Sequence, residues 1–391
     1  MSDDTSGLPL SFKTQLGQKR AGVILGVPAA DIFLAEARQL GHHYKEVMVQ
    51  EGASGSSWRM TSDEGSYLGG TDLAPFPLGF FNAGLQSDLA GRVVHLAKTR
   101  AISWTEIAVR VSTRYSLSGS FVQGTGQGYA EAVGAHVAFH SSASDAELTA
   151  LVRDAVDQSP AYDLVQRPLE NTFALYFNGR RRALTSLPAS TAAAPTDPFL
   201  KYAKAPTPLP DTAGLGDLII KTGERTEGVS ATPAGSTPTA GGRITWVVNG
   251  DGRTDAVTGL YRCKVALNRP GSSHFFYVSD ETESDRAPSG LSLLSAAIAF
   301  CYMTQLSRYI DAMKLSIRNV RLVQLSPYAI DASARGVADP CDTHLFLQGE
   351  AEEEMFERLQ LIAANTCYLH QTMVCATPLD VVVSNGGRTL V

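Results

Sequence analysis

The predicted secondary structure of this chain repeats, with the same order of strands and helices in its two halves. Short runs of alternating apolar and polar residues predict strands, and longer stretches with helical apolar spacing predict helices. The first half gives two strands, a long apolar helix, two strands, a second helix and a last strand, and the second half gives the same order with one additional strand before its long helix. The first copy of this β-β-α-β-β-α-β unit covers residues 41–182, and the second covers residues 243–391. A duplicated unit implies an internal twofold in which the long helices meet.

We therefore predict an α+β fold in which the two units form an intramolecular pseudo-dimer, with the long central helices packed on antiparallel sheets. In the first unit, helices are predicted at 78–98 and after the capping box Ser144–Glu147, where hydroxyl and carboxylate satisfy free amides. In the second unit they are predicted at 291–313 and 351–373. The predicted strands are 43–50, 57–64, 102–115, 129–140, 172–178, 244–248, 261–267, 274–279, 320–328, 343–349 and 379–384.

Two segments lie outside the repeated units. Residues 1–40 are assigned to an N-terminal tail. Residues 183–242 are rich in proline, alanine, threonine and glycine, a composition typical of a linker with little capacity to form a core. Within this linker, Leu218–Ile220 predicts one short strand. With 391 residues and 44% hydrophobic content, the chain can bury two cores.

Charge and cysteine content restrict the compartment and the partners. A net charge of -6 argues against nucleic acid and against an anionic membrane surface, because both need a basic face. The first residues lack a secretory signal, and the longest apolar run, Leu291–Met303, is too short to span a bilayer. The five cysteines are odd in number, unlike a secreted disulfide framework. We expect a cytoplasmic protein, a monomeric pseudo-dimer or a homodimer, that binds a small molecule.

The helix predicted near Gly290 carries the most distinctive candidate residue. The stretch Ala287–Met303 opens with Pro-Ser-Gly and continues as an almost uncharged run, which predicts a helix buried on all sides. Cys301 lies inside it, and Cys367 lies near the C-terminal end of the helix predicted at 351–373. Taken alone, each thiol is interpreted as a buried small hydrophobic group.

The segment Ser62–Asp72, which reads Ser-Asp-Glu-Gly-Ser-Tyr-Leu-Gly-Gly-Thr-Asp, is followed by Pro77-Leu78 and a helix, and resembles the OsmC-like family. That family comprises the osmotically inducible protein and the organic hydroperoxide resistance proteins. The resemblance covers Gly41–Asn178 and Arg243–Asn385. It implies intertwined dimers of the β-β-α-β-β-α-β unit, with a peroxidatic cysteine inside the first long helix and a resolving cysteine on the second.

Carried over residue by residue, the resemblance places the family's two cysteines in the second unit only. The first cysteine follows the start of its helix by eleven residues, and Gly290 and Cys301 match this spacing. Cys367 matches the second cysteine. In the first unit the same positions hold Asp88 and Ser159, so the resemblance implies one thiol site in each chain.

The family's activating residues match less well. In the organic hydroperoxide resistance proteins, a glutamate directly follows the first residue of the helix, and an arginine lies in a loop between strands. Here Leu291 follows Gly290. The loop is similar to Asn249–Arg253, in which Gly250 aligns with the arginine and Arg253 lies three residues on. Arg253 is therefore the candidate cation beside the thiol.

The resemblance implies a cysteine-dependent reductase of organic hydroperoxides or of a related small electrophile. Cys301 becomes a sulfenic acid, and Cys367 condenses with it to a disulfide, which requires Cα atoms within about 7 Å. A thiol reductant completes the cycle, and no cofactor or metal is called for. We expect a hydrophobic substrate in a pocket lined by apolar residues, namely Phe80, Phe81, Leu293, Leu294 and Phe300.

Two other functions fit the same sequence. One is a hydrolase or isomerase of a carbonyl compound, with Cys301 as nucleophile or Asp88 as general acid or base. A carboxylate in a buried helix needs a partner, and Arg59 and Arg92 are the candidates. The other function is non-catalytic binding of a hydrophobic ligand.

The remaining cysteines and one histidine are given structural roles. His370 lies one helical turn after Cys367 and is assigned to a polar helix face, although it could also act as a base. The cysteines that match no position of the family are interpreted as structural, namely Cys263, Cys341 and Cys375.

The other histidines and a basic run are assigned to solvated positions. His136 and His140 share one face of a predicted strand, but no third ligand with the spacing of a metal site lies nearby. We therefore predict no metal. His42, His43 and the run Arg180–Arg182 are interpreted as solvated edges.

Overall fold

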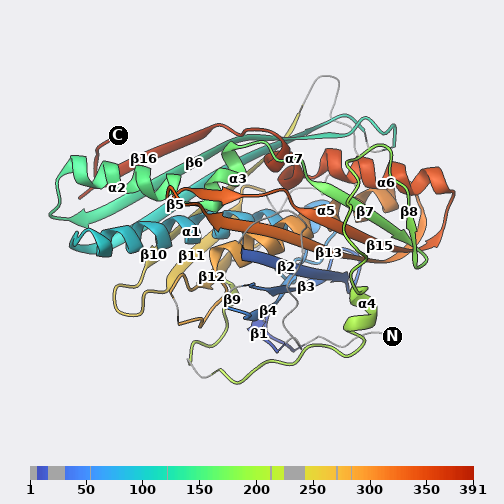
Figure 1. Ribbon diagram of the computed structural model, residues 1–391, viewed down its shortest axis with the longest axis horizontal. Coiled ribbons are helices and arrows are strands. Elements are labelled where there is room, and N and C mark those ends of the chain that lie inside the picture. The colour runs from blue at the N-terminus through green and yellow to red at the C-terminus, as the bar shows by residue number, and fades with distance from the viewer. Residues whose placement is uncertain are drawn as a thin grey trace.

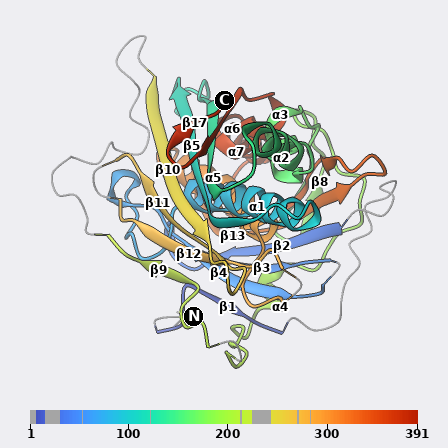
Figure 2. The same cartoon turned by 90° about the vertical axis from the view of Figure 1, so that its left-hand side faces the viewer.

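The computed structural model is built from two mixed, mostly antiparallel β-sheets with two long helices between them (Figure 1). The view from the side shows the same layers (Figure 2). The α+β class predicted from the sequence is confirmed. The structure describes residues 7–15, 31–52, 54–120, 122–211, 214–223, 243–269, 272–282 and 284–391.

The first sheet draws its strands from both halves of the chain. In spatial order it contains β1 (Ser11–Lys13), β4 (Ser57–Ser62), β3 (Lys45–Gln50), β2 (Asp31–Gln39), β13 (Ser316–Ile330), β15 (Asp342–Glu350), β7 (Thr172–Phe177) and β8 (Arg180–Arg182). A short strand, β14 (Gly336–Ala338), pairs with the end of β13. Most pairs are antiparallel, and β15 with β7 is parallel.

The second sheet is assembled in the same way. In spatial order it contains β17 (Arg388–Thr389), β16 (Leu379–Asn385), β6 (Gln127–Ser141), β5 (Trp104–Ser118), β10 (Ile244–Thr254), β11 (Tyr261–Leu267), β12 (Phe275–Ser279) and β9 (Ile219–Lys221). Strand β9 confirms the short strand that was predicted inside the linker.

The two sheets have corresponding strand orders once the halves of the chain are exchanged. In the first, β4-β3-β2 are followed by β13 and β15 and then by β7. In the second, β12-β11-β10 are followed by β5 and β6 and then by β16. The pairs β2 with β13 and β10 with β5 are both antiparallel, while β15 with β7 and β6 with β16 are both parallel. Each half therefore completes a sheet with strands of the other.

The long helices α1 (Pro77–Thr99) and α5 (Gly290–Ala312) pack against each other between the sheets. Helix α1 contacts β5, β10 and β11, and α5 contacts β2, β3 and β13. Each begins with a favourable residue. Pro77 occupies the first turn of α1, where its missing N–H is not needed, and the Ser289 side chain accepts from the Ser292 amide. The shorter helices are α2 (Asp145–Asp157), α3 (Pro160–Gln166), α4 (Pro198–Lys201), α6 (Glu353–Thr366) and α7 (Tyr368–Val374).

Helix α5 is apolar over most of its length. It has 23 residues, and within the described part of the chain it alone has the length and hydropathy that a membrane span requires. The apolar window of α5 is entirely buried inside the protein, because α1 and the first sheet cover it.

Two glycines allow α1 and α5 to approach at backbone distance. A Cβ on Gly84 would lie 2.7 Å from the Leu294 Cγ and 2.8 Å from the Gly290 carbonyl oxygen. A Cβ on Gly290 would lie 2.7 Å from the Asp88 backbone nitrogen. Contacts this short do not occur between real carbon atoms, so both positions require glycine. The Gly84–Gly290 crossing therefore fixes how closely the helices pack.

The structure corrects two predicted elements. Strand β2, which lies in the segment assigned to a tail, is hydrogen-bonded on both sides, to β3 and to β13. Apolar and polar residues alternate only weakly along β2, because both faces of this strand are buried and most of its residues are buried with them. The helix predicted at 351–373 is two helices, α6 and α7, because Cys367 has extended backbone angles (φ -73°, ψ 111°) between them.

We predict that Gly84→Val lowers the free energy of unfolding by about 1–3 kcal/mol, because the added carbons force the two helices apart. Urea unfolding monitored by circular dichroism measures the change. Gly134→Val is the matched control, since a Cβ on Gly134 meets no atom within 4 Å and the residue lies in β6. Equal stability of the Gly84→Val variant and the wild type would contradict the proposed close crossing.

Candidate functional site

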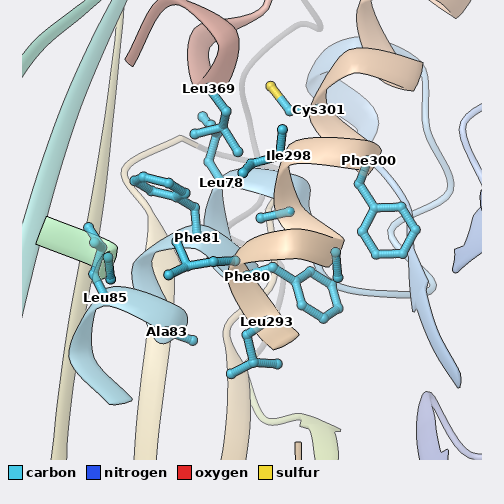
Figure 3. Close-up of a cluster of buried hydrophobic side chains, with 14 of the residues drawn as sticks. Leu78, Phe80, Phe81, Ala83, Leu85, Leu293, Ile298, Phe300, Cys301 and Leu369 are labelled. Atoms are coloured by element: carbon cyan, nitrogen blue, oxygen red, sulfur yellow. The ribbon is translucent and has the colours of Figure 1, made fainter. Parts of the chain in front are cut away.

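The thiols of Cys301 and Cys367 lie together in the protein interior. Cys301 is in the middle of α5, and Cys367 is the residue that joins α6 to α7. Their residues are 2% and 0% exposed, and both cysteines are free. The Cys367 thiol is close enough to Cys301 to raise the pKa of the Cys301 thiol. In Figure 3 the Cys301 side chain points toward the chain that carries Leu369 of α7. The pair predicted from the sequence is therefore brought into contact.

Backbone amides at the start of α7 face both sulfur atoms. The His370 N–H donates to the Cys367 Sγ at 3.4 Å, and the Leu369 backbone amide lies near the Cys301 sulfur, where it favours the thiolate form. Burial, followed by the interaction with Cys367, raises the pKa of the Cys301 thiol well above its usual value, and the Leu369 amide opposes this shift. Cys301 is therefore protonated at rest, so its reaction as a nucleophile requires a base.

A buried cation and a buried carboxylate lie beside Cys301. The Lys45 ammonium donates to the Thr304 hydroxyl at 2.9 Å, and this hydroxyl donates to the Glu64 carboxylate at 2.8 Å. Tyr67 donates its phenolic proton to the other Glu64 oxygen at 3.1 Å. Lys45 and Glu64 are 2% and 4% exposed. Thr304 is one helical turn after Cys301, so this charged chain reaches the thiol along α5.

Burial shifts the pKa values of these two charged groups toward their neutral forms. It lowers the pKa of Lys45, while the Glu64 carboxylate, Asp63 and Cys301 act in the opposite direction. It also raises the pKa of Glu64, against the effects of Lys45, Thr304 and Tyr67. A carboxylate whose pKa is raised is a better proton acceptor than an exposed one. The group next to the thiol is therefore suited to act as a base.

A small pocket of about 20 Å³, roughly the space of one water molecule, adjoins the thiol. Its lining includes Cys301, Glu64, Thr304 and Gln305, and the other lining residues are aromatic or aliphatic, namely Tyr67, Leu68, Phe76, Pro77, Leu78, Trp246, Leu267 and Tyr368. The apolar lining predicted from the sequence is wrong in detail. Those five residues lie in the core instead, packed between the two long helices and the sheets: Phe80, Phe81, Leu293, Leu294 and Phe300.

The equivalent positions of the first half hold a different pair. Ser159 joins α2 to α3 as Cys367 joins α6 to α7, and its hydroxyl accepts from the Tyr162 amide at 3.1 Å. The Ser159 hydroxyl donates to Asp88 on α1. Arg92 donates to the other Asp88 oxygen at 3.2 Å, which confirms one of the two partners predicted for Asp88. Arg59, the other candidate, pairs with Glu46.

A second carboxyl group, which is half-buried, lies next to Asp88. Glu281 follows β12 within Ser279-Asp280-Glu281, just as Glu64 follows β4 within Ser62-Asp63-Glu64. It accepts from the Ser87 hydroxyl at 2.7 Å and from the Gly290 amide at 2.5 Å. Burial and then the neighbouring Asp88 raise the pKa of Glu281 to about 7. Each long helix thus receives a glutamate from the opposite half of the chain.

Arg253 and His370 are not where the sequence analysis expected them. Arg253 lies on β10 with 71% of its side chain exposed, and it pairs with Glu106 at 3.4 Å, so it does not line the thiol pocket. His370 is buried, not on a solvated helix face, and its Nδ1 lies 3.3 Å from the Asn171 amide nitrogen. Burial lowers the pKa of His370 to about 4, so its ring is neutral near pH 7.

The other residues given structural roles differ in exposure. Cys263 and Cys341 are buried, whereas Cys375 is exposed. His136 donates to or accepts from Ser384, and His140 lies near Glu106, so the two rings have different partners. His42 is exposed as predicted, but His43 is 2% exposed, and that prediction is wrong.

Sequence reasoning missed Lys45 and Thr304 and did not assign a role to Glu64 or Glu281. The sequence could have pointed to Glu64 and Glu281, because each belongs to a Ser-Asp-Glu triplet at the end of a predicted strand, once in each half. Nothing in the sequence pointed to Lys45, since a lysine at the start of a strand is usually exposed. Comparisons of the chain with models of known protein families and with curated proteins found no match.

We predict that Lys45→Met lowers the free energy of unfolding by about 3–5 kcal/mol, because it leaves the buried Glu64 carboxylate without its cation. The double variant Lys45→Met/Glu64→Gln should recover a substantial part of this loss. Urea unfolding of both variants, with the exposed Lys98→Met as control, measures the coupling. Strictly additive effects would contradict an interaction between the two charges.

We predict that Glu281→Gln removes a loss of stability that the wild type shows as pH rises. Between about pH 4.5 and 7 the glutamate ionises in the unfolded chain but stays protonated in the folded one, so folding becomes less favourable across that window. The full difference is at most about 3 kcal/mol. Thermal unfolding at pH 5 and pH 8 measures it, with the exposed Glu354→Gln as control. A variant that tracks the wild type at both pH values would contradict the raised pKa.

Proposed function

We propose that this chain is a thiol-dependent reductase of organic hydroperoxides, built as two fused OsmC-like units. The observation that carries the proposal is the proximity of Cys367 to Cys301, whose thiol adjoins a small, largely apolar pocket. A nucleophilic thiol and a second thiol within its reach are the parts that a two-cysteine peroxidase needs. The two thiols are held by α5 and by the junction of α6 and α7.

The strand order supports the fused-dimer part of this proposal. Each sheet joins three strands of one half to two central strands of the other and then to a returning strand of the first. Such an exchange is what the resemblance to intertwined OsmC-like dimers implies. In a single chain, the linker joins the two units, and the pseudo-twofold would pass between α1 and α5.

The reaction has two chemical steps before reduction. The Cys301 sulfur attacks the terminal oxygen of R–O–OH, so an S–O bond forms, the O–O bond breaks, and the alcohol ROH leaves with the thiol's proton. Sulfur is oxidised to a sulfenic acid and the peroxide is reduced. The Cys367 thiol then attacks that sulfur, which releases water and forms the disulfide. An external dithiol returns both cysteines to thiols and becomes a disulfide itself.

In this proposal Glu64 and Lys45 supply the activation that Arg253 does not. The raised pKa of Cys301 leaves little thiolate at rest, and the nearby Glu64 carboxylate accepts the proton as the sulfur attacks. The ammonium of Lys45, held by Thr304, offsets the negative charge that develops on sulfur. The surrounding Trp246 and Leu267 favour a substrate with an apolar R group.

We predict that one equivalent of cumene hydroperoxide converts the reduced protein to a Cys301–Cys367 disulfide, seen by peptide mass spectrometry. Cys301→Ser should abolish peroxide consumption, and Cys367→Ser should accumulate sulfenic acid that dimedone traps. Cys341→Ser, which removes another buried thiol, is the control. Wild-type peroxide consumption by the Cys301→Ser variant would refute the proposal.

A second candidate function is acid–base catalysis on a carbonyl compound at the first-half position. One observation favours it: Glu281, with a pKa of about 7, sits beside Asp88 and lines a surface hollow with Thr254, Gly259 and Thr282. Two carboxyl groups in different protonation states can divide the roles of acid and base. Turnover of an ester or ketone substrate that is abolished by Asp88→Asn but unaffected by Cys301→Ser would favour this alternative.

A further inference from the structure

Three potential metal ligands converge at the end of α5 that is away from its capped start. His42 and His43 lie in the turn between β2 and β3, and Asp311 lies in the last turn of α5. One ligand atom of each residue lies within 4.8 Å of those of the other two. The His42 Nε2 is 2.6 Å from an Asp311 carboxylate oxygen, and the two histidine rings are in edge contact at 4.2 Å between centroids.

The His43 ring provides an independent observation at the same place. His43 is only 2% exposed, and neither of its ring nitrogens has a partner at hydrogen-bonding geometry among the described residues. Leaving a buried polar group without a partner costs about 1–3 kcal/mol.

Three charged or chargeable side chains surround the His43 ring, namely Lys45, His42 and Arg308. The Arg308 guanidinium donates to Gln305 at 2.9 Å, and the Lys45 ammonium donates to Thr304 and to the His43 carbonyl oxygen. These cations oppose a dication, and the Asp311 carboxylate counters them.

We propose that His42, His43 and Asp311 bind one divalent ion of the zinc class. Two imidazoles and one carboxylate are a donor set that Zn²⁺ accepts, with water as the fourth ligand. The ion can enter from solvent, because His42 and Asp311 line an open hollow together with Ser307 and Ile310. This inference is independent of the proposed reductase activity.

Binding would fix the turn that precedes Lys45. The ion would join the β2–β3 turn to the end of α5, and Lys45 follows His43 by two residues and bonds its carbonyl oxygen at 3.0 Å. Asp311 is ten residues from Cys301, or about 15 Å along the helix, so the ion would not touch the thiols. Its role is therefore to hold the position of Lys45 and not to take part in the redox chemistry.

Calorimetric titration of the reduced full-length protein with ZnCl₂, and absorption spectra with Co²⁺, test the proposal. We expect one equivalent to bind, with Co²⁺ showing d–d bands and no thiolate charge-transfer band. His42→Ala and Asp311→Asn, both at partly exposed side chains, should each weaken Zn²⁺ binding about 10-fold or more. His140→Ala, an exposed histidine beside another carboxylate, should bind as the wild type does.

Three results would overturn the proposal. One is that no Zn²⁺ binds at all. Another is that binding is unchanged by both His42→Ala and Asp311→Asn. The last is a Co²⁺ spectrum dominated by thiolate charge transfer, which would place the ion at cysteine side chains instead. Because both variants alter partly exposed groups, a matching circular dichroism spectrum will show that a loss of binding is not a loss of folding.

Discussion

The backbone contact between α1 and α5 at Gly84 and Gly290 is the constraint on which the rest of the structure depends. The two helices lie at the centre, and each is covered by a sheet made from both halves of the chain. With the two helices this close, Glu64 at the end of β4 lies near Cys301, and Glu281 at the end of β12 lies near Asp88. Each of these two positions is thus completed by a residue from the other half of the chain.

The same symmetry makes the chemical difference between the two positions clear. One position holds two thiols with a lysine and a glutamate. The other holds Asp88 with a serine, an arginine and Glu281, so its buried charge is already paired. A fused chain can keep one position reactive and use the other for internal hydrogen bonds, because a change in one half no longer appears twice. This division explains why a single thiol pair is compatible with a duplicated fold.

Local sequence patterns predicted many of the helices and strands. The features that depend on contacts between residues far apart in the sequence were not predicted. The capping box at Ser144, the helix carrying Cys301 and most strands depend on nearby residues, so they were predictable. Strand β2 was missed because burial on both faces removes alternation. Lys45 and Glu64 were missed as partners because they meet through Thr304, which is 240 residues from Glu64 and belongs to the other half. Arg253 was chosen by its position in a loop, and its side chain is on the surface.

The most direct test of this account compares the two equivalent glutamates in the same assay. The second-order rate of cumene hydroperoxide reduction is measured for Glu64→Gln and for Glu281→Gln, with an excess of dithiol reductant. If Glu64 is the base for Cys301, its variant should be slower by about 10²-fold or more, while the Glu281 variant keeps the wild-type rate. Equal rates for the two variants, or a loss only in Glu281→Gln, would contradict the assignment of Glu64 as the base for Cys301.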